Sequence, residues 1–188
     1  MIVNKTKYLE FKCAKSPSGS DWHYVKRTND SDSHDSAVVI TTIVKKNNEY
    51  NFLFLKTHRP PISAEHKAKY CLESPAGLIG DEDTSETLIN CVKKELLEET
   101  GYSANELYLE LKNSSTSSGL SSETITYYSA IVNYDKIIKK PVDDGGIICE
   151  RIFVPISNID NFLANINQNE ISISAATICG LYFALKRL

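Results

Sequence analysis

Three glutamates stand close together in the segment KKELLEETGY, residues 93–102, with two leucines between them. A charged run of this kind most often forms the solvated face of a helix. An α-helix turns by about 100° per residue, which places Leu88, Val92 and Leu96 on one apolar stripe. The chemistry of the segment therefore depends on which glutamates share that stripe.

Two of the glutamates fall on or beside the apolar stripe. Glu99 lies inside it in helical angle and Glu95 lies at its edge, whereas Glu98 is four residues beyond Lys94, where an ordinary ion pair accounts for it. An unpaired carboxylate that faces a core costs several kcal/mol or takes up a proton. A divalent cation stabilises such carboxylates, and oxygen ligands suit Mg²⁺ or Mn²⁺. The pattern therefore favours a metal site.

The spacing around this helix matches a longer motif. Gly80 is followed by five residues, Glu86, seven residues, the triplet KEL that begins at Lys94, one residue, the pair EE, one residue and Gly101. This order resembles the Nudix box, whose pattern is Gly, five residues, Glu, seven residues, Arg-Glu-aliphatic, one residue, Glu-Glu, one residue and Gly-aliphatic. Every acid and both glycines match, while Lys94 replaces the usual arginine and Tyr102 the usual aliphatic residue.

Nudix proteins hydrolyse a nucleoside diphosphate linked to another moiety and hold divalent cations with a strand–loop–helix. The resemblance implies that Glu95, Glu98 and Glu99 face the metal and that Glu86 supports the loop and helix start or the metal shell. Mg²⁺ or Mn²⁺ would be the cofactor, because a cation neutralises phosphate charge and acidifies a bound water. Lys94 would orient the glutamates with its charge but without the bidentate fork of arginine.

The flanking segments resemble one branch of the family, the ADP-ribose pyrophosphatases. That branch carries Arg-Pro-Pro and then Glu-x-Pro-Ala-Gly-Leu-Ile; here RPP begins at Arg59 and ESPAGLI at Glu73. The resemblance implies that the carbonyl of Ala76 binds metal. It also implies that Trp22 stacks on adenine in a homodimer that exchanges its N-terminal strands, with Tyr8 of the other subunit as a second face.

The same resemblance implies further substrate contacts. Arg27 and Arg59 are the candidates for gripping the phosphates or the terminal ribose, with Glu73 beside them. Gly119 and Leu120, in the Ser-rich segment KNSSTSSGLSSE, complete the expected substrate site. The alternatives are a core position for the single tryptophan and solvated surface positions for the arginines.

Departures from the branch leave the substrate and the general base open. The glycine of Pro-Ala-Gly is Gly77, three residues before the glycine in register with the box, and Ser118 stands where the branch has a marker proline. The late loop that offers a glutamate base in the branch has Ile147 at the aligned position. The candidates for the base are Asp143, Asp144, Glu123 and, as the preferred residue, Glu150.

The composition of this 188-residue chain is that of one ordinary globular domain, with 41% hydrophobic and 24% charged residues. A net charge of −3 argues against nucleic acid as a partner. No apolar run approaches the roughly 20 residues that cross a bilayer, and the N-terminus lacks an apolar signal core. We therefore expect no membrane partner and a cytoplasmic or nuclear location. Five widely spaced cysteines predict reduced core thiols rather than disulfides or a zinc site.

Hydrophobic patterning predicts strands with two long helices among them. The helices are expected at residues 84–100, with the acidic residues 81–83 before them and Gly101 at the end, and at residues 172–188. RPPISAEHKAK and TNDSDSHDS are predicted to be loops, and YCLESPAGLIG a short strand running into a turn. The other strands are expected at residues 8–13, 22–27, 37–44, 50–57, 107–111, 124–132 and 147–154.

These elements predict an α/β or α+β fold with a mixed β-sheet between helices and an N-terminal antiparallel β-region. We expect residues 1–35 to form that β-region and its loop, exchanged in a dimer, and residues 36–188 to form the hydrolase domain. The leading prediction for function is metal-dependent hydrolysis of ADP-ribose or a related nucleoside diphosphate sugar. The alternatives are hydrolysis of another nucleotide, such as an NDP-hexose, a dinucleotide or a nucleoside triphosphate, and nucleotide binding with weak catalysis.

Overall fold

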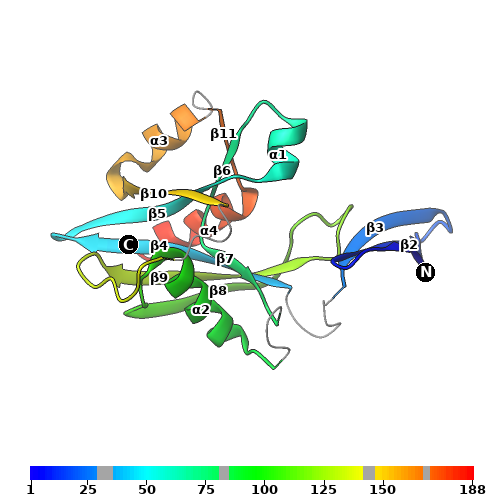
Figure 1. The fold of residues 1–188 in the computed structure, drawn as a ribbon, viewed down its shortest axis with the longest axis horizontal. Coiled ribbons are helices and arrows are strands. Elements are labelled where there is room, and N and C mark those ends of the chain that lie inside the picture. Colours follow the sequence, from blue (N-terminus) through cyan, green and yellow to red (C-terminus); the bar gives the residue numbers. More distant parts are fainter. Residues whose placement is uncertain (29–35, 81–84, 142–146, 167–169) are drawn as a thin grey trace.

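Two separate β-sheets make up the strands of the protein, with helices on both faces of the larger sheet (Figure 1). The computed structural model describes residues 1–28, 36–80, 85–141, 147–166 and 170–188. The smaller sheet is antiparallel, with the order β1 (Ile2–Lys5), β2 (Leu9–Lys15) and β3 (Asp21–Arg27). It projects from one end of the body, at the right of Figure 1. The antiparallel N-terminal β-region is therefore confirmed, with one strand more than predicted.

The larger sheet has eight strands in the order β11-β6-β5-β4-β9-β8, with β10 beside β5 and β7 beside β4. β4 pairs with β9 and β6 pairs with β11 in parallel, and the remaining pairs are antiparallel. The predicted mixed sheet and fold class are thus confirmed. Its strands are β4 (Ala37–Lys46), β5 (Glu49–Thr57), β6 (Tyr70–Glu73), β7 (Ala76–Leu78), β8 (Glu106–Ser115), β9 (Thr124–Asn133), β10 (Ile148–Pro155) and β11 (Ile171–Ile173).

Strand β4 forms the centre of this sheet because its sequence is apolar or β-branched on both faces. All eight residues of AVVITTIV are buried, as expected for a strand covered on both sides. The turn into β5 places Asn47 at φ 48° and Asn48 at φ 64°. Asparagine tolerates this left-handed backbone, so β4 and β5 form an antiparallel hairpin with a tight turn.

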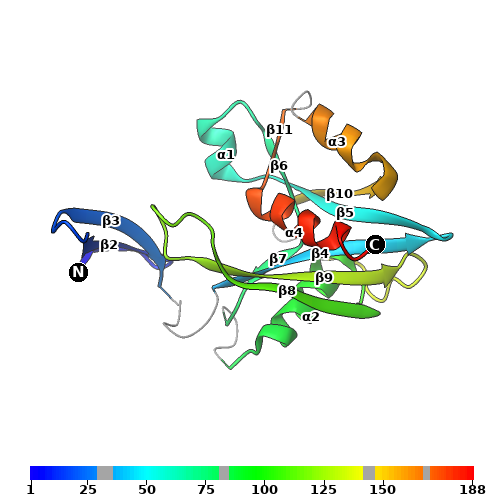
Figure 2. The same cartoon turned by 180° about the vertical axis from the view of Figure 1, so that it is seen from behind.

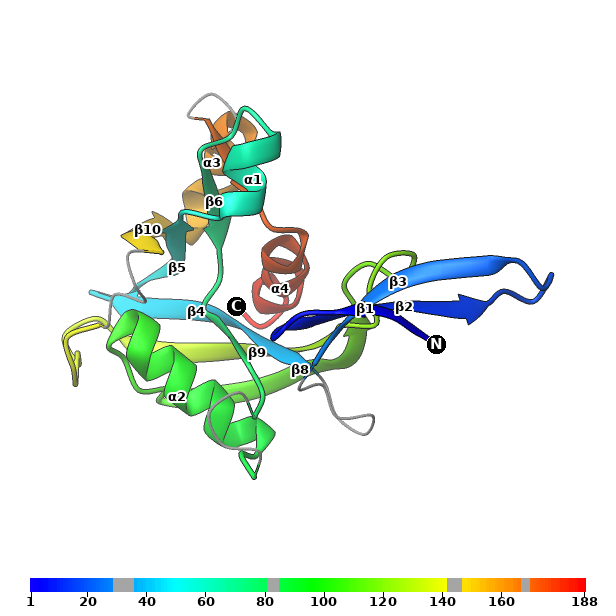
Figure 3. The ribbon, with the colours of Figure 1, turned by 45° about the vertical axis from the view of Figure 1, so that its right-hand side comes forward.

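Helices α2 (Leu88–Thr100) and α4 (Ala175–Leu185) cover opposite faces of the larger sheet (Figures 2 and 3). On the α2 side, Val92 and Leu96 pack in one core with strand residues such as Val38. On the other side, Leu181 packs in a second core with Ile43. Each helix therefore buries one apolar stripe against the sheet. The two cores hold both helices in place on the sheet.

Helix α4 approaches the sheet very closely at Gly180. A Cβ atom added to this glycine would lie 2.3 Å from the hydroxyl oxygen of Thr41 on β4. Any side chain at this position would therefore push the helix off the sheet.

Several predicted boundaries and elements were wrong. RPPISAEHKAK contains a helix, α1 (Pro60–Glu65), because proline at the first helical positions suits a helix start. The C-terminal helix begins at Ala175 rather than Ser172, because β11 uses these residues to pair with β6. Helix α3 (Ile159–Asn165), the 3₁₀ turn η1 (Ile156–Asn158) and strand β1 were not predicted.

Helix α2 begins at Leu88, where Thr87 caps it and the Thr87 side chain accepts a hydrogen bond from the Asn90 backbone N–H. This start lies later than the predicted Thr84. Thr84 itself and the acidic residues 81–83 lie outside the described residues, as do Asp143, Asp144 and most of TNDSDSHDS. Strand β8 continues to Ser115, beyond the predicted end at residue 111, and so includes the first residues of the Ser-rich segment.

All five cysteines are free thiols. Cys13, Cys71 and Cys91 are buried and Cys179 is half-buried, whereas Cys149 is exposed, which corrects the prediction that all are core residues. Within the described segments, no helix combines the length and the apolar character that crossing a bilayer requires.

Candidate active site

Helix α2 buries the apolar stripe predicted from its sequence and turns one carboxylate inward with it. Val92 and Leu96 are buried, and the helix ends at Gly101, whose φ is 81°. One carboxylate oxygen of the half-buried Glu99 accepts a hydrogen bond of 3.0 Å from the backbone N–H of Ala76. Burial raises the pKa of Glu99 to about 8, while the Ala76 N–H lowers it and the neighbouring Glu95 raises it further. The carboxylate is thus held in a place where a positive charge would stabilise it.

Glu95 lies against the backbone of Gly77 at the start of the box loop. A Cβ atom on Gly77 would meet Glu95 Cδ at 2.2 Å, so the glutamate occupies the space that any other residue would fill. This contact explains why a glycine stands in β7 at this point. It also brings the strand β7 and the helix α2 together around two carboxylates, Glu95 and Glu99.

The second glycine of the loop, Gly80, has a different role. Its φ is 74°, a left-handed backbone that favours glycine, and its N–H donates to Glu86 Oε2 at 3.3 Å. Lys94 Nζ lies 3.4 Å from Glu86 Oε1 and 3.4 Å from Glu95 Oε1. Lys94 therefore bridges Glu86, which holds the loop at Gly80, and Glu95, which lies at the cavity. Gly77 and Gly80 are both required, which accounts for the offset of three residues between the two motifs.

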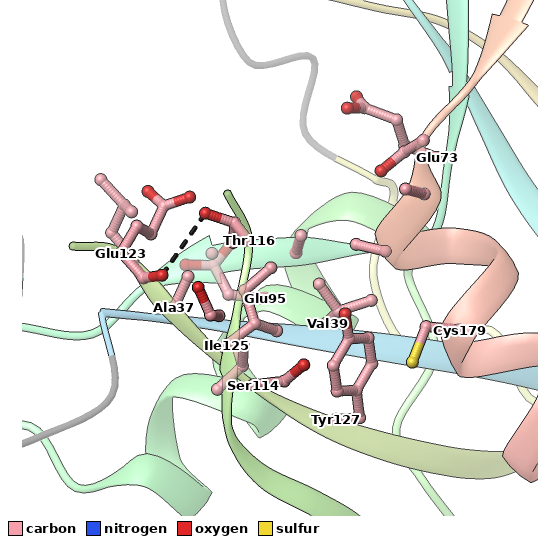
Figure 4. Close-up of a pocket in the computed structure, with 18 of the residues that line it drawn as sticks. Ala37, Val39, Glu73, Glu95, Ser114, Thr116, Glu123, Ile125, Tyr127 and Cys179 are labelled. Atoms are coloured by element: carbon pink, nitrogen blue, oxygen red, sulfur yellow. Dashed lines mark hydrogen bonds between the residues drawn. The ribbon is translucent and has the colours of Figure 1, made fainter. Parts of the chain in front are cut away.

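A cavity of about 770 Å³ opens beside these carboxylates. In Figure 4, Glu73 and Glu123 lie on either side of Glu95, and the backbone carbonyl of Glu123 accepts a hydrogen bond from Thr116. The charged residues that line the cavity are Arg27, Arg59, Glu73, Glu95, Glu99 and Glu123. The cavity is therefore rich in acids and also contains two guanidinium groups.

Each arginine of the cavity is held by one of its acids. Arg59 Nε donates to Glu73 Oε2 at 2.8 Å, and Thr57 Oγ1 donates to the same oxygen at 2.7 Å. Arg27 Nε donates to Glu123 Oε2 at 2.6 Å. Each arginine has further N–H groups, so these ion pairs orient the guanidinium groups beside the cavity.

The opposite wall of the cavity comes from residues that the sequence did not single out. Ser174, Ala175 and Cys179 of the α4 region and Tyr127 of β9 line it, together with small apolar residues of β4 and β7. Burial and, to a smaller extent, the neighbouring Cys179 raise the pKa of Tyr127 to about 12. The only available signal was the alternation of TITYYSAIV, which places Tyr127 on one face of a strand. The turn at Ser174 was missed because the sequence predicted a helix that already begins at Ser172.

The predicted adenine site does not line this cavity. Trp22 is 53% exposed, and its indole N–H donates to the carbonyl of Gly119 at 2.9 Å. The Leu120 carbonyl accepts from the Val25 N–H at 2.8 Å, while Tyr8 is exposed on the smaller sheet. Gly119 and Leu120 therefore attach the N-terminal sheet to the body, and Trp22 is a surface residue rather than a core residue.

Glu98 and Glu150 also lie outside the cavity lining. Glu98 is half-buried on α2, whereas Glu150 lines a second cavity of about 510 Å³ and lies 3.7 Å from Lys56. The backbone carbonyl of Ile147 accepts from the His58 N–H at 2.8 Å. Among the described candidates for the base, Glu123 is brought to the first cavity and Glu150 is not.

The first cavity offers donors that fit a hard divalent cation. In the described part of the chain, no three side chains of His, Cys, Asp or Glu form a ready-made cage. Mg²⁺ does not need one, because it keeps several waters and binds through one or two carboxylates and the phosphates of a substrate. Glu95 and Glu99 supply two such carboxylates next to Ala76. The donor set therefore fits Mg²⁺ or Mn²⁺ and does not suit a thiolate-bound metal.

Known proteins resemble the chain in sequence and in fold. No protein-family model matches it. An uncharacterized Nudix hydrolase of Schizosaccharomyces pombe is 38% identical over 81 residues, 43% of this chain and only 36% of that protein's length. A protein of Caenorhabditis elegans named "Putative nudix hydrolase 2" is 27% identical over 187 residues, 96% of this chain and 80% of that protein.

Two solved structures share the fold. An ADP compounds hydrolase superimposes with a TM-score of 0.68 over 100% of this chain and 90% of that chain, at 16% identity. The Nudix domain of Shewanella oneidensis NrtR, solved with ADP ribose, superimposes with a TM-score of 0.55 over 84% of this chain and 90% of that chain, at 15% identity. At these identities the superpositions establish the fold.

The class of protein follows from the fold and the box together: an α+β protein whose box helix turns carboxylates toward a cavity at the end of a mixed sheet. With the curated relatives added, the chain is similar to Nudix hydrolases in sequence and in fold, and its motifs resemble those of the ADP-ribose pyrophosphatase branch.

Proposed function

We propose that this protein hydrolyses the pyrophosphate bond of ADP-ribose, or of a related nucleoside diphosphate sugar, and releases AMP and ribose 5-phosphate. One observation carries the proposal. Two carboxylates of the box helix and two guanidinium groups line the same cavity: Glu95, Glu99, Arg27 and Arg59. Carboxylates that hold a cation and guanidinium groups that grip phosphate are what pyrophosphate hydrolysis requires. The ADP ribose bound by the S. oneidensis Nudix domain supports the choice of substrate.

Different residues would hold the cation and keep the cation site in shape. Glu95, Glu99 and the carbonyl of Ala76 would hold the Mg²⁺ or Mn²⁺ ion, with Glu86 and Lys94 keeping the loop and Glu95 in place. A bound cation of this kind supplies neutralisation of the phosphate charge and a more acidic water.

Arg59 and Arg27 would exchange part of their contact with Glu73 and Glu123 for contact with the phosphates or the terminal ribose. A guanidinium group suits this exchange because it presents five N–H donors and can keep one partner while it binds another.

Glu123 is the better candidate for the general base. It lines the cavity and belongs to the segment next to Thr116, whereas Glu150 faces the second cavity. A base must lie within hydrogen-bond reach of the attacking water, directly or through one further water. We therefore assign proton transfer to Glu123 in place of the Glu150 expected from the sequence. Glu98, expected at the metal, lies outside the cavity lining and receives no role there.

We further propose that residues 1–35 serve a second subunit. The smaller sheet exposes apolar side chains, with Trp22 53%, Tyr8 66% and Phe11 41% exposed. Adenine stacking between Trp22 of one subunit and Tyr8 of the other in a homodimer would cover part of this surface. Residues 36–188 would then form the hydrolase domain.

The direct test is incubation of the purified protein with ADP-ribose and Mg²⁺, with nucleotides separated by chromatography. We expect AMP and ribose 5-phosphate from the wild type and neither product from Glu99→Gln. A panel of NDP-hexoses, dinucleotides and nucleoside triphosphates would reveal a different substrate. The proposal fails if none of these compounds is turned over with Mg²⁺ or Mn²⁺.

One observation favours a second candidate function, a nucleotide-binding protein with weak catalysis. The position aligned with the late-loop glutamate of the branch is Ile147, and the nearby Glu150 faces a different cavity. Tight ADP-ribose binding by calorimetry without AMP release would favour this function over the hydrolase.

A further inference from the structure

The protein has a basic surface that also exposes two isoleucines. It lies at the end of the larger sheet opposite the N-terminal sheet (Figure 1). We call it the lysine patch. It consists of the tip of the β4–β5 hairpin, with Lys45 and Lys46, and of the loop that follows β9. The loop contributes Lys136, Ile137, Ile138, Lys139 and Lys140.

The two segments of the lysine patch lie side by side (Figures 1–3). The Tyr134 backbone N–H donates to the Lys45 carbonyl at 3.0 Å, and Lys46 Nζ lies 3.9 Å from the centre of the Tyr134 ring. Because these contacts join hairpin and loop, the lysines of both segments form one continuous surface.

Backbone contacts hold the loop in a defined shape. The Ile138 N–H donates to the carbonyl of Gly101, at the end of α2, at 2.9 Å, and Ile137 forms a β-bridge with Tyr102. A Cβ atom on Gly101 would lie 2.4 Å from the Lys139 carbonyl oxygen, so the loop packs directly on this glycine. The isoleucines are nevertheless exposed, Ile137 by 57% and Ile138 by 67%. Two adjacent aliphatic side chains are therefore presented to the solvent by a fixed backbone.

The charge of the lysine patch opposes that of the whole chain. All five of its lysines are exposed, and the only acids in its two segments, residues 45–49 and 134–140 of the described chain, are Glu49 and Asp135. The chain as a whole has a formal net charge of −3. A locally positive surface on a negative protein is suited to a partner with diffuse negative charge.

We propose that the lysine patch docks on an anionic phospholipid surface, with Ile137 and Ile138 entering the headgroup region and the lysines contacting the lipid phosphates and carboxylates. Basic residues around an apolar tip combine the two terms of peripheral membrane binding, electrostatic attraction and apolar burial. One such term alone gives weak and reversible attachment, so both are needed.

The composition of the patch favours lipid over other anionic partners. Its cations are all lysines, and lysine is depleted in protein interfaces, where arginine is enriched. Lys45 and Lys46 lie over the rings of Tyr50 and Tyr134, at 5.9 and 3.9 Å, so neither ring is free to stack on a base of single-stranded nucleic acid. A pair of exposed isoleucines has no partner in a polyanion but gains from an acyl chain.

Docking at the lysine patch would leave the cavity accessible. Strand β4 lines the cavity with residues 37–39 and ends in the patch with Lys45 and Lys46. At roughly 3.3 Å per residue, the two ends lie about 25 Å apart. This surface contact needs no membrane-spanning helix, and it replaces the expectation of no membrane partner that was drawn from the sequence. It rests on the fold and not on the proposed hydrolysis.

The experiment is co-sedimentation of the purified full chain with phosphatidylcholine vesicles, with and without about one third phosphatidylserine. We expect binding only to the anionic vesicles. Lys139→Glu/Lys140→Glu should weaken it by about 25-fold or more, since each lysine near an anionic leaflet contributes about fivefold. Ile137→Ser/Ile138→Ser should weaken it by about tenfold or more, because two apolar side chains no longer enter the headgroups.

The matched control is Lys67→Glu/Lys112→Glu, which makes the same charge change at exposed positions outside the patch. It should bind like the wild type, and all variants should keep the wild-type thermal midpoint. The proposal is overturned if the wild type does not sediment with anionic vesicles, or if the control loses as much binding as the patch variants. Binding to heparin that equals vesicle binding and ignores the isoleucine change would also overturn it, in favour of a polyanion.

Discussion

Two cavities lined by described residues, the first beside Glu95 and the second beside Glu150, differ in how their acids are held. In the first, Glu95 and Glu99 come from one helix, face the β7 backbone and crowd each other, and burial raises the pKa of Glu99 to about 8. In the second, Glu150 stands on a strand edge 3.7 Å from Lys56, with its side chain 59% exposed. Desolvated and crowded carboxylates need a cation, whereas a solvated and paired carboxylate does not. An acid near the expected place in the sequence is therefore not enough to identify a functional residue, because burial and charge around the carboxylate determine what it can bind.

The largest effect expected from this difference is on turnover. Glu99→Gln should lower ADP-ribose hydrolysis by about a thousandfold, because loss of a metal ligand removes several kcal/mol of transition-state stabilisation. Glu150→Gln should leave kcat/KM within about twofold, since Glu150 faces the other cavity. Steady-state kinetics of the two variants measure kcat/KM. A comparable loss of kcat/KM in both variants would contradict the proposed difference between the two cavities.

Crowding at the first cavity can be tested through a glycine. Gly77→Ala should lower kcat/KM by about 100-fold, because the new Cβ would lie 2.2 Å from Glu95 Cδ and displace the carboxylate. Gly119→Ala is the matched control, since its Cβ would meet only Trp22, at an ordinary 3.8 Å. Thermal unfolding should show both variants folded. Full activity in Gly77→Ala would mean that Glu95 need not lie where it does.

A smaller effect is expected at Lys94, which bridges Glu86 and Glu95. Lys94→Ala should weaken Mn²⁺ binding by about tenfold, as loss of a group that orients a metal ligand usually does. Lys94→Arg should strengthen it, because the guanidinium fork can hold both glutamates at once. Lys93→Ala, at the exposed neighbouring position, is the control. The bridging role is wrong if Lys94→Ala and Lys93→Ala bind Mn²⁺ alike.

The smallest effect concerns stability without metal. The pKa of Glu99 is about 8 in the folded protein and about 4.5 in the unfolded chain, so the folded state binds the extra proton between these values. Its contribution to stability is complete below about pH 4.5 and is lost as the pH rises through about 8. In EDTA the free energy of unfolding should therefore fall as the pH rises from 5 to 9, because the folded state loses its extra proton in this window. Denaturant titrations of Glu99→Gln should lack this component; an identical slope in both proteins would contradict the burial of Glu99.

The sequence predicted the central strands and the box helix well because their signals are local. AVVITTIV is apolar along its length, and the stripe Leu88, Val92, Leu96 repeats at helical spacing, so burial follows from periodicity alone. Helix α1 and strand β11 were missed because they are short, and β11 exists only through its pairing with β6. Short elements of this kind are determined by tertiary contacts.

The candidate site was likewise predicted only where its residues lie in one local element. The spacing of the box singles out Glu95, Glu99 and Lys94, because one helix fixes their relative positions. The wall formed by Tyr127, Ser174 and Cys179 depends on how α4 packs across the sheet, which no local pattern encodes. The choice of Glu150 came from nearness in sequence to Ile147, and the side of β10 on which a residue falls depends on the register with β5.

The central claim is that Glu95 and Glu99 hold a divalent cation in the first cavity. Titration with Mn²⁺, followed by the electron paramagnetic resonance of the free ion, tests it directly and independently of turnover. We predict saturable uptake by the wild type and by Glu150→Gln, and loss of that uptake in Glu95→Gln/Glu99→Gln. Equal uptake by the double variant, or none by the wild type with or without ADP-ribose, would contradict the claim.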